Sequence, residues 1–449
     1  MDKPLQRIDH IMWDADTPDS IATIAGIMTF KKKLNKAHML EVLEKGLMRY
    51  ERFQKTVIIK DGNPMWHDAK DSFILENHIH HIALPGKGGY AELQACVSDL
   101  ISHPLDYSKP LWDIHVIDNY NNGTALFWRV HHVIGDGIAL VKVIFSLTGI
   151  SAKDSLTVFG KKEKPRRVKV KDKVEYIVDL GMSLYEEAKQ LLHDPSIVRD
   201  MLHHNWELAK EAGDLFKNKK ANRLYKGEPG QAKKAAWIGP LPLDTFKQLA
   251  KHYEAKVNDV MLATVAGAMR RHLQKHKQAL SEVVKVVIPV NIRREGEVNS
   301  LNNDFSFITV NLPVHLSSFA KRVDYIKKKT TALKPTANSM LMTEMIHIVA
   351  DYTPLNAKQK MLAFMGKSIA GVVTNVPGPQ HPIYLAGGKV EDLMFWVPHT
   401  VPLGMGVSLM SYNKKVYMGI VSDNVLVKDP DFIVKGFAAE LKRAEKLLV

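Results

Sequence analysis

The sequence predicts an α/β protein in two halves, each built around a mixed β-sheet. Helix and strand patterns alternate along the 449 residues, so helices and strands are expected to pack together in both halves. Asn121-Asn122-Gly123 between two apolar runs predicts an antiparallel hairpin. A strongly basic stretch divides the chain near its middle. We therefore expect an N-terminal subdomain at 1–155, a basic and partly helical connector at 156–235, and a C-terminal subdomain at 236–449.

The first half reads as strands and helices in turn. Its expected elements are a strand at 21–30, a helix at 36–49 capped by Asn35, a strand at 73–84, a helix at 90–102, strands at 112–117 and 124–130, and a helix at 138–147. Prolines at 104 and 110 predict a rigid loop before the strand that starts at Trp112. His78, His80 and His81 lie in the third segment, but no Cys, Asp or Glu completes a ligand set at metal-binding spacing, so we expect ordinary histidines and no metal site.

The second half follows a helix-forming connector region at 174–220. Its expected elements are helices at 243–252 and 258–275, strands at 283–290 and 305–314, a helix at 319–333, a strand at 372–376 that ends in a proline-rich turn, a three-strand antiparallel meander at 390–397, 406–412 and 415–422, and a closing helix at 429–448. Asn258 is the expected N-cap of the second of these helices, with Asp259 favourable against the helix dipole.

The composition bounds the partners and the compartment. The net charge of +14 and the basic runs at 161–171 and 217–220, with Lys233-Lys234, predict an anionic partner or a solvated linker. Neither run is interleaved with aromatic residues, so a membrane or lipid-droplet surface is favoured and nucleic acid is not. The single cysteine, Cys96, fits a reducing compartment, and we find neither a signal-peptide pattern nor an apolar run of membrane-spanning length. We expect a cytoplasmic protein associated peripherally with the inner membrane face or lipid inclusions.

The stretch most typical of chemistry is His131-His132-Val133-Ile134-Gly135-Asp136-Gly137, at the end of an apolar strand. A neutral imidazole accepts a proton near pH 7, so one histidine can act as a general base. Neighbouring residues on a strand point to opposite faces, so the other histidine is expected to pack or hydrogen-bond elsewhere. Asp136 can orient the turn, through backbone N–H groups or by pairing with an arginine. A packed strand end without chemistry is the alternative interpretation of the same residues.

Several segments together resemble one known family. His131 to Gly137 resembles the HHxxxDG motif of acyltransferases with the chloramphenicol-acetyltransferase-like fold. Pro110-Leu111-Trp112, Val257-Asn258-Asp259-Val260 and Thr374-Asn375-Val376-Pro377-Gly378-Pro379 are similar to the PLW, ND and NVPGP segments of the bacterial wax ester synthase/diacylglycerol acyltransferase family. A second-half pair, with Ile288 to Arg293 followed by Asn303 to Phe307, also resembles that family. The similarity runs from about residue 5 to the C-terminus.

The resemblance implies two chloramphenicol-acetyltransferase-like subdomains with an active-site tunnel at their interface. It implies transfer of a fatty acyl group from acyl-coenzyme A, which is a substrate rather than a cofactor, to a long-chain alcohol or a diacylglycerol. By the same resemblance His132 is the general base, and Asp136 orients the site beside His131, with Arg293 as its partner. Residues expected to bind substrate or shape the site are Gly137, Asn258, Asp259, Asn375 and Trp112. For Asn258 and Asn375, helix capping and a turn are the competing structural roles.

Two other functions remain open from the sequence. One is a condensation-type acyltransferase that takes its acyl group from a carrier protein, although no carrier domain lies in this chain. The other is a lipid-surface binding protein with a vestigial site, an interpretation favoured by the basic connector. The chain departs from the family at residues 19–24, at Asn302 and at 398–405, which affects the expected acceptor preference more than the expected reaction.

Overall fold

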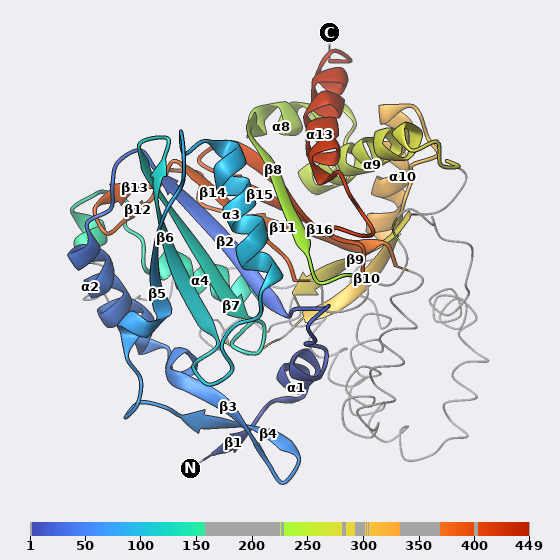
Figure 1. The fold of residues 1–449 in the computed structure, drawn as a ribbon. Coiled ribbons are helices and arrows are strands. Elements are labelled where there is room, and N and C mark those ends of the chain that lie inside the picture. Colours follow the sequence, from blue (N-terminus) through green and yellow to red (C-terminus); the bar gives the residue numbers. More distant parts are fainter. Residues whose placement is uncertain are drawn as a thin grey trace, which may run out of the picture.

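Two mixed β-sheets that lie against one another form the protein (Figure 1). The computed structural model describes residues 2–157, 225, 229–280, 284–291, 301, 303, 305–332, 369–398 and 403–448. Among these residues, one large hydrophobic cluster combines side chains of both sheets, and a second cluster lies between the second sheet and its helices. The predicted α/β class, with a mixed sheet in each half, is confirmed.

The first sheet has the strand order β14-β2-β7-β6-β5. Its strands are β14 (Asp392–Trp396), β2 (Thr23–Phe30), β7 (Gly123–His131), β6 (Trp112–Tyr120) and β5 (Ile79–Ala83). Only the β5–β6 pair is parallel. The predicted hairpin joins β6 to β7, and Asn121 and Asn122 adopt the positive φ values of 49° and 64° that a tight hairpin turn requires.

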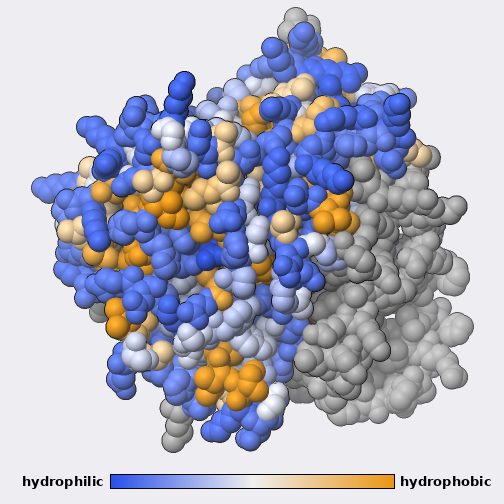
Figure 2. Space-filling model, in the orientation of Figure 1, coloured by the Kyte–Doolittle hydropathy of each residue, from blue (hydrophilic) through white to orange (hydrophobic). Residues whose placement is uncertain are grey.

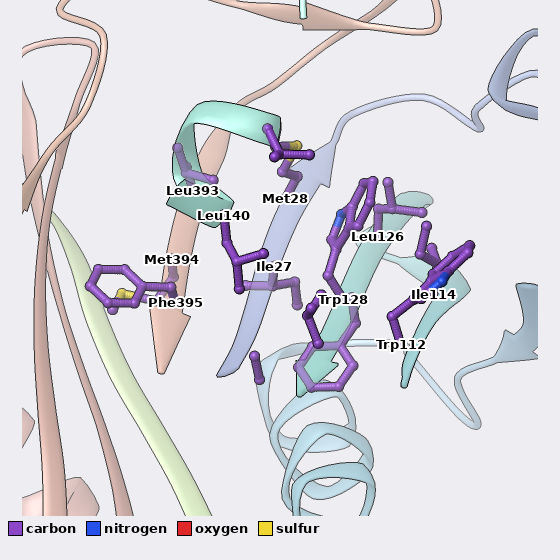
Figure 3. Packing of buried hydrophobic residues seen from close by; sticks show 14 of the residues in the cluster. Ile27, Met28, Trp112, Ile114, Leu126, Trp128, Leu140, Leu393, Met394 and Phe395 are labelled. Carbon is purple, nitrogen blue, oxygen red and sulfur yellow. The ribbon is translucent and has the colours of Figure 1, made fainter. Parts of the chain in front are cut away.

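The helices of the first half are α1 (Arg7–Asp14), α2 (Lys36–Gly46), α3 (Tyr90–Ser102) and α4 (Gly137–Ser146). Buried side chains of α2, α3 and α4 belong to the same cluster as the strands of this sheet, whereas α1 forms a separate small cluster with Phe307 of the second half. Asn35 caps α2 as predicted, because its side chain accepts from the N–H of His38 at 3.0 Å. Leu140 of α4 belongs to the same packed cluster as Ile27 of β2 and Trp128 of β7 (Figure 3). This apolar contact fixes α4, and with it the turn that follows β7.

The second sheet has the order β10-β9-β11-β15-β16-β8. Its strands are β10 (Phe305–Leu312), β9 (Val284–Asn291), β11 (Gly371–Pro377), β15 (Met405–Tyr412), β16 (Lys415–Asp423) and β8 (Lys233–Pro242). Strand β11 runs parallel to both of its neighbours. The helices described in this half are α8 (Leu243–His252), α9 (Val257–Lys275), α10 (Phe319–Ala332) and α13 (Pro430–Glu445), which group at one side of the described molecule (Figure 1).

Small elements complete the described chain. A three-stranded sheet contains β1 (Lys3–Pro4), β4 (Asn63–Asp68) and β3 (Lys55–Lys60), and a two-stranded sheet contains β12 (Tyr384–Leu385) and β13 (Gly388–Lys389). Short 3-10 helices are η1 (Leu47–Arg49), η2 (Glu51–Gln54), η3 (Leu75–His78) and η4 (Asp154–Leu156). The strand predicted at 73–84 is therefore shorter, since His78 ends η3 and only His80 and His81 lie on β5.

The meander predicted for three strands of the second half is wrong at its first strand. Strands β15 and β16 pair as expected, but β14 pairs antiparallel with β2 in the first sheet. Thr29 donates its hydroxyl hydrogen to Asp392 at 3.0 Å, which helps to fix this register. Alternating apolar residues reveal which face of a strand is buried and say nothing about its partner, so the pattern could not distinguish the two sheets.

Helix α3 of the first half covers β8, an edge strand of the second sheet. Gln94 donates to the carbonyl of Ala235 at 2.9 Å, and Ser98 accepts from the N–H of the same residue at 3.0 Å. Ser102 accepts from the N–H of Lys233 at 2.8 Å. These bonds satisfy backbone groups of an edge strand that would otherwise be open to pairing. They also join the two halves of the protein.

Two sequence expectations about charge and capping change. Lys233, assigned to a basic run, is buried and bonds Asp423 at 2.7 Å, while Lys234 pairs with Asp431 at 2.9 Å, so both have acidic partners within the fold. Helix α9 begins at Val257, with Lys256 as its N-cap, so the prediction of Asn258 as N-cap is wrong. Asp259 provides the capping bond by accepting from the N–H of Lys256 at 3.0 Å. The basic run at 161–171 lies outside the described residues.

The described surface is mixed in character. The face in Figure 2 is mainly hydrophilic, with hydrophobic side chains in small separate groups. No helix among the described residues is long and apolar enough to cross a membrane.

Candidate active site

The two neighbouring histidines lie at the end of β7, where adjacent segments hold their backbone. The N–H of His131 donates to the carbonyl of Leu111 at 2.9 Å, and the N–H of His132 donates to the carbonyl of Ala22 at 2.7 Å. The segments before β6 and β2 thus clamp the strand end from both sides. This clamp fixes the directions of the two imidazole rings, which contact different partners, as the strand argument predicted.

His131 occupies a closed pocket within the first half. Its side chain is 1% exposed, and its Nε2 lies 3.3 Å from Asp16 Oδ2. Its Nδ1 accepts the N–H of Val133 at 3.1 Å, so the ring proton of the neutral imidazole is on Nε2, facing the carboxylate. Tyr107 donates its hydroxyl hydrogen to the same carboxylate, and the ring of Trp13 packs beside His131. With both nitrogens engaged, His131 has a positioning role in this arrangement.

His132 faces the second half. Its Nδ1 lies 2.9 Å from Asn303 Oδ1, across 171 residues of sequence. The amide nitrogen of Asn303 donates to Asp9 Oδ1 at 2.6 Å and to the carbonyl of His132 at 2.8 Å. A carboxylate and a carbonyl oxygen both require a donor, so the amide orientation is determined by its partners. The amide oxygen therefore faces His132, and the ring proton is on Nδ1.

This tautomer leaves Nε2 of His132 with its lone pair. Burial lowers the pKa of His132, and the nearby Asp136 carboxylate opposes that effect. The imidazole is consequently neutral at physiological pH. A neutral imidazole with a fixed Nδ1–H and a basic Nε2 can remove a proton from a bound hydroxyl group.

Asp9 and Arg52 support Asn303. The side chain of Asp9 is fully buried, and its Oδ2 lies 2.8 Å from an Arg52 guanidinium nitrogen. Burial raises the pKa of Asp9, and the positive charge of Arg52 opposes that rise. Arg52 also donates to the carbonyls of Val133 and Ile134, both at 3.1 Å, and to that of Leu301 at 3.2 Å. One guanidinium thus ties the turn after the histidines to the segment that contains Asn303.

Asp136 shapes the turn through the backbone. Its Oδ1 accepts the N–H of Ala139 at 2.9 Å, so it is the N-cap of α4, which confirms the first of the two expected orienting roles. Gly135 allows a close approach, since a Cβ there would lie 2.9 Å from the carbonyl oxygen of Leu301. A Cβ on Gly137 would meet no described atom within 4 Å. Arg293, the expected partner of Asp136, lies outside the described residues.

Among the remaining predicted site residues, Asn258, Asp259 and Asn375 lie in the second half, and Trp112 lies in the first. Asn375 on β11 donates to Asn258 Oδ1 at 3.2 Å, so two residues 117 positions apart meet. Asp259 is buried and accepts from Thr330 at 2.8 Å, in addition to capping α9. Trp112 is a core residue, because its Nε1–H donates to the carbonyl of Phe53 at 2.8 Å and its ring stacks on His78.

Sequence reasoning missed Asp9, Asp16 and Arg52 as site residues, and it quoted Asn303 only as part of a similar segment. A signal for Asp9 was present, since this acid lies among the apolar residues Ile8, Ile11 and Met12 of α1. An acid on an apolar helix face is buried only with a partner, which points to a network.

Solved structures share this arrangement of sheets. A wax ester synthase/diacylglycerol acyltransferase from Marinobacter aquaeolei matches with a TM-score of 0.70 and 18% identity over 99% of both chains. The first condensation domain of the CDA synthetase matches with a TM-score of 0.60 and 14% identity, over 100% of this chain and 96% of that one. These similarities show that the chain shares the condensation-domain, chloramphenicol-acetyltransferase-like architecture.

Family descriptions and relatives narrow the class. The wax ester synthase/diacylglycerol acyltransferase catalytic domain matches residues 5–261, and the WS/DGAT C-terminal domain matches residues 301–445. O-acyltransferase WSD of Acinetobacter baylyi is 24% identical over 94% of this chain and 92% of its own length. A probable diacylglycerol O-acyltransferase of Mycobacterium tuberculosis is 24% identical over 85% and 81%. The chain belongs to the wax ester synthase/diacylglycerol acyltransferase family and is an O-acyltransferase.

Proposed function

We propose that this enzyme transfers a fatty acyl group from acyl-coenzyme A to the hydroxyl of a long-chain alcohol or a diacylglycerol. The names of the similar proteins support these substrate classes, since they include a wax ester synthase and diacylglycerol acyltransferases. The single observation that carries the mechanism is the orientation of the Asn303 amide, which assigns the ring proton of His132 to Nδ1. A channel between the two sheets is the proposed route of both substrates to His132.

The proposed reaction is a direct transfer without an acyl-enzyme. His132 Nε2 takes the hydroxyl proton while the hydroxyl oxygen attacks the thioester carbonyl carbon. The tetrahedral intermediate then breaks its C–S bond, and the departing thiolate takes the proton from the imidazolium. The products are an ester and free coenzyme A, and the enzyme returns to its starting protonation state. Asn303 keeps Nδ1–H in place throughout, so the imidazolium proton is lost from Nε2.

The other predicted residues receive supporting roles in this proposal. Gly137 leaves room beside the start of α4, and the Asn258–Asn375 pair shapes the site from the second half. Asp259 and Trp112 support the walls through the contacts described above. Asp136 keeps the turn after the histidines in place and its charge favours the imidazolium that forms during the reaction.

The test is turnover of labelled acyl-coenzyme A with a panel of hexadecanol and diacylglycerol acceptors. We expect ester formation by the natural enzyme and a loss of roughly 10²–10⁴-fold in kcat for His132→Ala, the contribution typical of a general base. The matched control is His38→Ala, a half-exposed residue in the first turn of α2, which should keep full activity. A folded His132→Ala enzyme with normal turnover would exclude the base.

The donor and the alternative functions are decided by the same assay. Turnover with carrier-bound acyl groups but not with free acyl-coenzyme A would replace the proposed donor with a carrier protein. Binding to lipid vesicles without turnover of either donor would favour the lipid-binding alternative and contradict the proposed enzyme activity on these substrates.

We further propose that the enzyme associates peripherally with an anionic lipid surface at the cytoplasmic face. The support is the net charge of +14, because exposed lysines and arginines attract anionic headgroups. Binding to anionic vesicles should weaken as salt is raised, since charges are screened over about 8 Å at physiological ionic strength. Binding that does not change with salt would indicate an apolar surface instead.

A further inference from the structure

A cluster of metal-ligating side chains lies at the end of α9, apart from the histidines of β7. His272 is in the last turn of α9, and His276 follows one turn later, so both project from the same side. Their ring centroids are 4.5 Å apart. Asp429, the residue before α13, faces both rings from a segment 157 residues from His272.

The donor atoms converge as a three-ligand site requires. Asp429 Oδ1 lies 2.6 Å from His272 Nε2 and 3.2 Å from His276 Nε2. One ligand atom from each of the three residues lies within 4.8 Å of the others. Donors around a tetrahedral zinc ion, with bonds of about 2.0–2.2 Å, are separated by roughly 3.4 Å. The His276–Asp429 separation of 3.2 Å is already close to that value, and a small opening of the His272–Asp429 contact would bring this second pair to it.

The surroundings prepare His272 for a metal. Its Nδ1 lies 3.0 Å from the hydroxyl of Tyr225, a fully buried side chain. A hydrogen bond to the second ring nitrogen orients an imidazole that is bound to metal through its first. Tyr225 has the position for this role.

A second cluster of two histidines and an aspartate is less suited to a metal ion. His80 and His115 lie near Asp113 on neighbouring strands, so the structure supplies the acid that the sequence spacing did not reveal. However, both oxygens of Asp113 bond the buried guanidinium of Arg129, at 3.0 and 2.5 Å. A divalent ion there would lie beside a fixed positive charge.

The competing cation at Asp429 is Lys275, which bonds Oδ2 of the carboxylate. Its side chain is 45% exposed and its ammonium also lies over the Phe432 ring, so water and that ring can replace the carboxylate as its partners when a metal binds. Asp429 and His276 are also partly exposed, which leaves water access for a fourth ligand.

We propose that His272, His276 and Asp429 form a zinc-binding site, with solvent as the fourth ligand, that ties the end of α9 to the start of α13. Imidazole nitrogens and a carboxylate suit Zn²⁺ and do not suit Mg²⁺, which prefers oxygen ligands. Because the ligands come from separate segments, zinc bound to the folded chain stabilises it by mass action.

The test uses the full-length chain without a histidine tag, stripped with a chelator. Calorimetric titration with Zn²⁺ should give equimolar binding, and thermal melting should show a higher Tm with zinc than with chelator. His276→Ala should weaken zinc binding by at least about tenfold and abolish the zinc-dependent rise in Tm. Tyr225→Phe should weaken binding while leaving all three ligands in place. Mg²⁺ at the same concentration should cause no rise.

The matched control is His80→Ala, in the cluster that Arg129 occupies, which should bind zinc as the natural chain does. Zinc binding of equal affinity in His276→Ala and the natural chain would overturn the proposal, and so would binding that is lost in His80→Ala instead. If His276→Ala does not fold, Asp429→Asn gives the same comparison, since its amide oxygen can still accept hydrogen bonds from both imidazoles. A lower Tm for that variant with an unchanged zinc affinity would likewise overturn the site.

Discussion

His131 and His132 are neighbours in the chain, yet their partners differ in chemistry and in origin. His131 presents Nε2 to the carboxylate of Asp16, and Asp16 and Tyr107 both come from the first half. His132 is held by the neutral amide of Asn303 from the second half, and the charge of Asp9 is one residue further away. A carboxylate in direct contact would favour the protonated ring, whereas an amide fixes the ring proton without adding charge. The comparison shows that the partner of each ring sets its role. His131 donates a hydrogen bond within the fold, whereas His132 is the base in the proposed reaction.

The largest expected effect follows from breaking the charge pair behind Asn303. Asp9→Ala leaves the Arg52 guanidinium without its buried carboxylate, so we expect a loss of about 3–5 kcal/mol in the free energy of unfolding. The measurement is urea unfolding, with Asp2→Ala as control. Asp2 pairs with His67 at the surface, where solvent screens the charges, so its removal should change the stability far less. Equal losses in the two variants would show that Asp9 has no special role.

Removing the amide should affect turnover more than binding. In Asn303→Leu, His132 loses the partner of its Nδ1–H, so its tautomer and orientation are no longer fixed. We expect kcat to fall about 10–100-fold, as when a partner that orients a functional imidazole is removed, with KM nearly unchanged. Steady-state kinetics on folded protein are the measurement. A change confined to KM would assign Asn303 to substrate binding instead.

The pH dependence distinguishes an amide from a carboxylate beside His132. The base must be neutral to act, and burial lowers the pKa of His132, so activity should persist below pH 6.5 before protonation removes it. In Asn303→Asp a negative charge next to the ring raises the pKa, and the acidic limb of the pH–rate profile should move to higher pH. An acidic limb at the same pH in both enzymes would mean that another group controls it.

The smallest effect is expected on the His131 side. Tyr107→Phe removes the hydroxyl that donates to Asp16, so we expect a loss of about 0.5–1.5 kcal/mol in stability. Turnover should stay within about twofold, because the contacts of Tyr107 within the described residues are with Asp16, Trp13 and His131. Thermal melting and kcat on the same preparation provide the check. A large loss of kcat with unchanged stability would contradict the structural role assigned to the His131 side.

Local chemistry explains what could be predicted from the sequence. The Asn-Asn-Gly hairpin and the cap at Asn35 depend on residues within a few positions of each other, and both predictions are confirmed. Asp136 orients the turn through a backbone N–H group, one of the two routes expected from the sequence. The opposite directions of His131 and His132 follow from the geometry of a strand. These features need no knowledge of the rest of the fold.

The features that could not be predicted from the sequence depend on partners that are far away in the chain. Asn303 and Asp9 are 294 residues apart, and periodicity shows that a side chain is buried without showing what it meets. The same limit applies to β14, whose alternating pattern fits either sheet. It also applies to His80, because Asp113 and His115 of the same cluster lie on another strand. Asn258 is a residue type that favours N-caps, but the N-cap of α9 lies two residues earlier, at Lys256.

The pairing of β14 with β2 has a consequence for biosynthesis. Thr29 and Asp392, which bond across this pair, are separated by 363 residues. During synthesis β2 therefore leaves the ribosome long before β14 has been made. Until then the first sheet has an open edge at β2. Open edges of this kind favour association with other chains. We therefore expect a fragment that ends before residue 391 to aggregate rather than fold as a separate domain, which light scattering of the purified fragment would check.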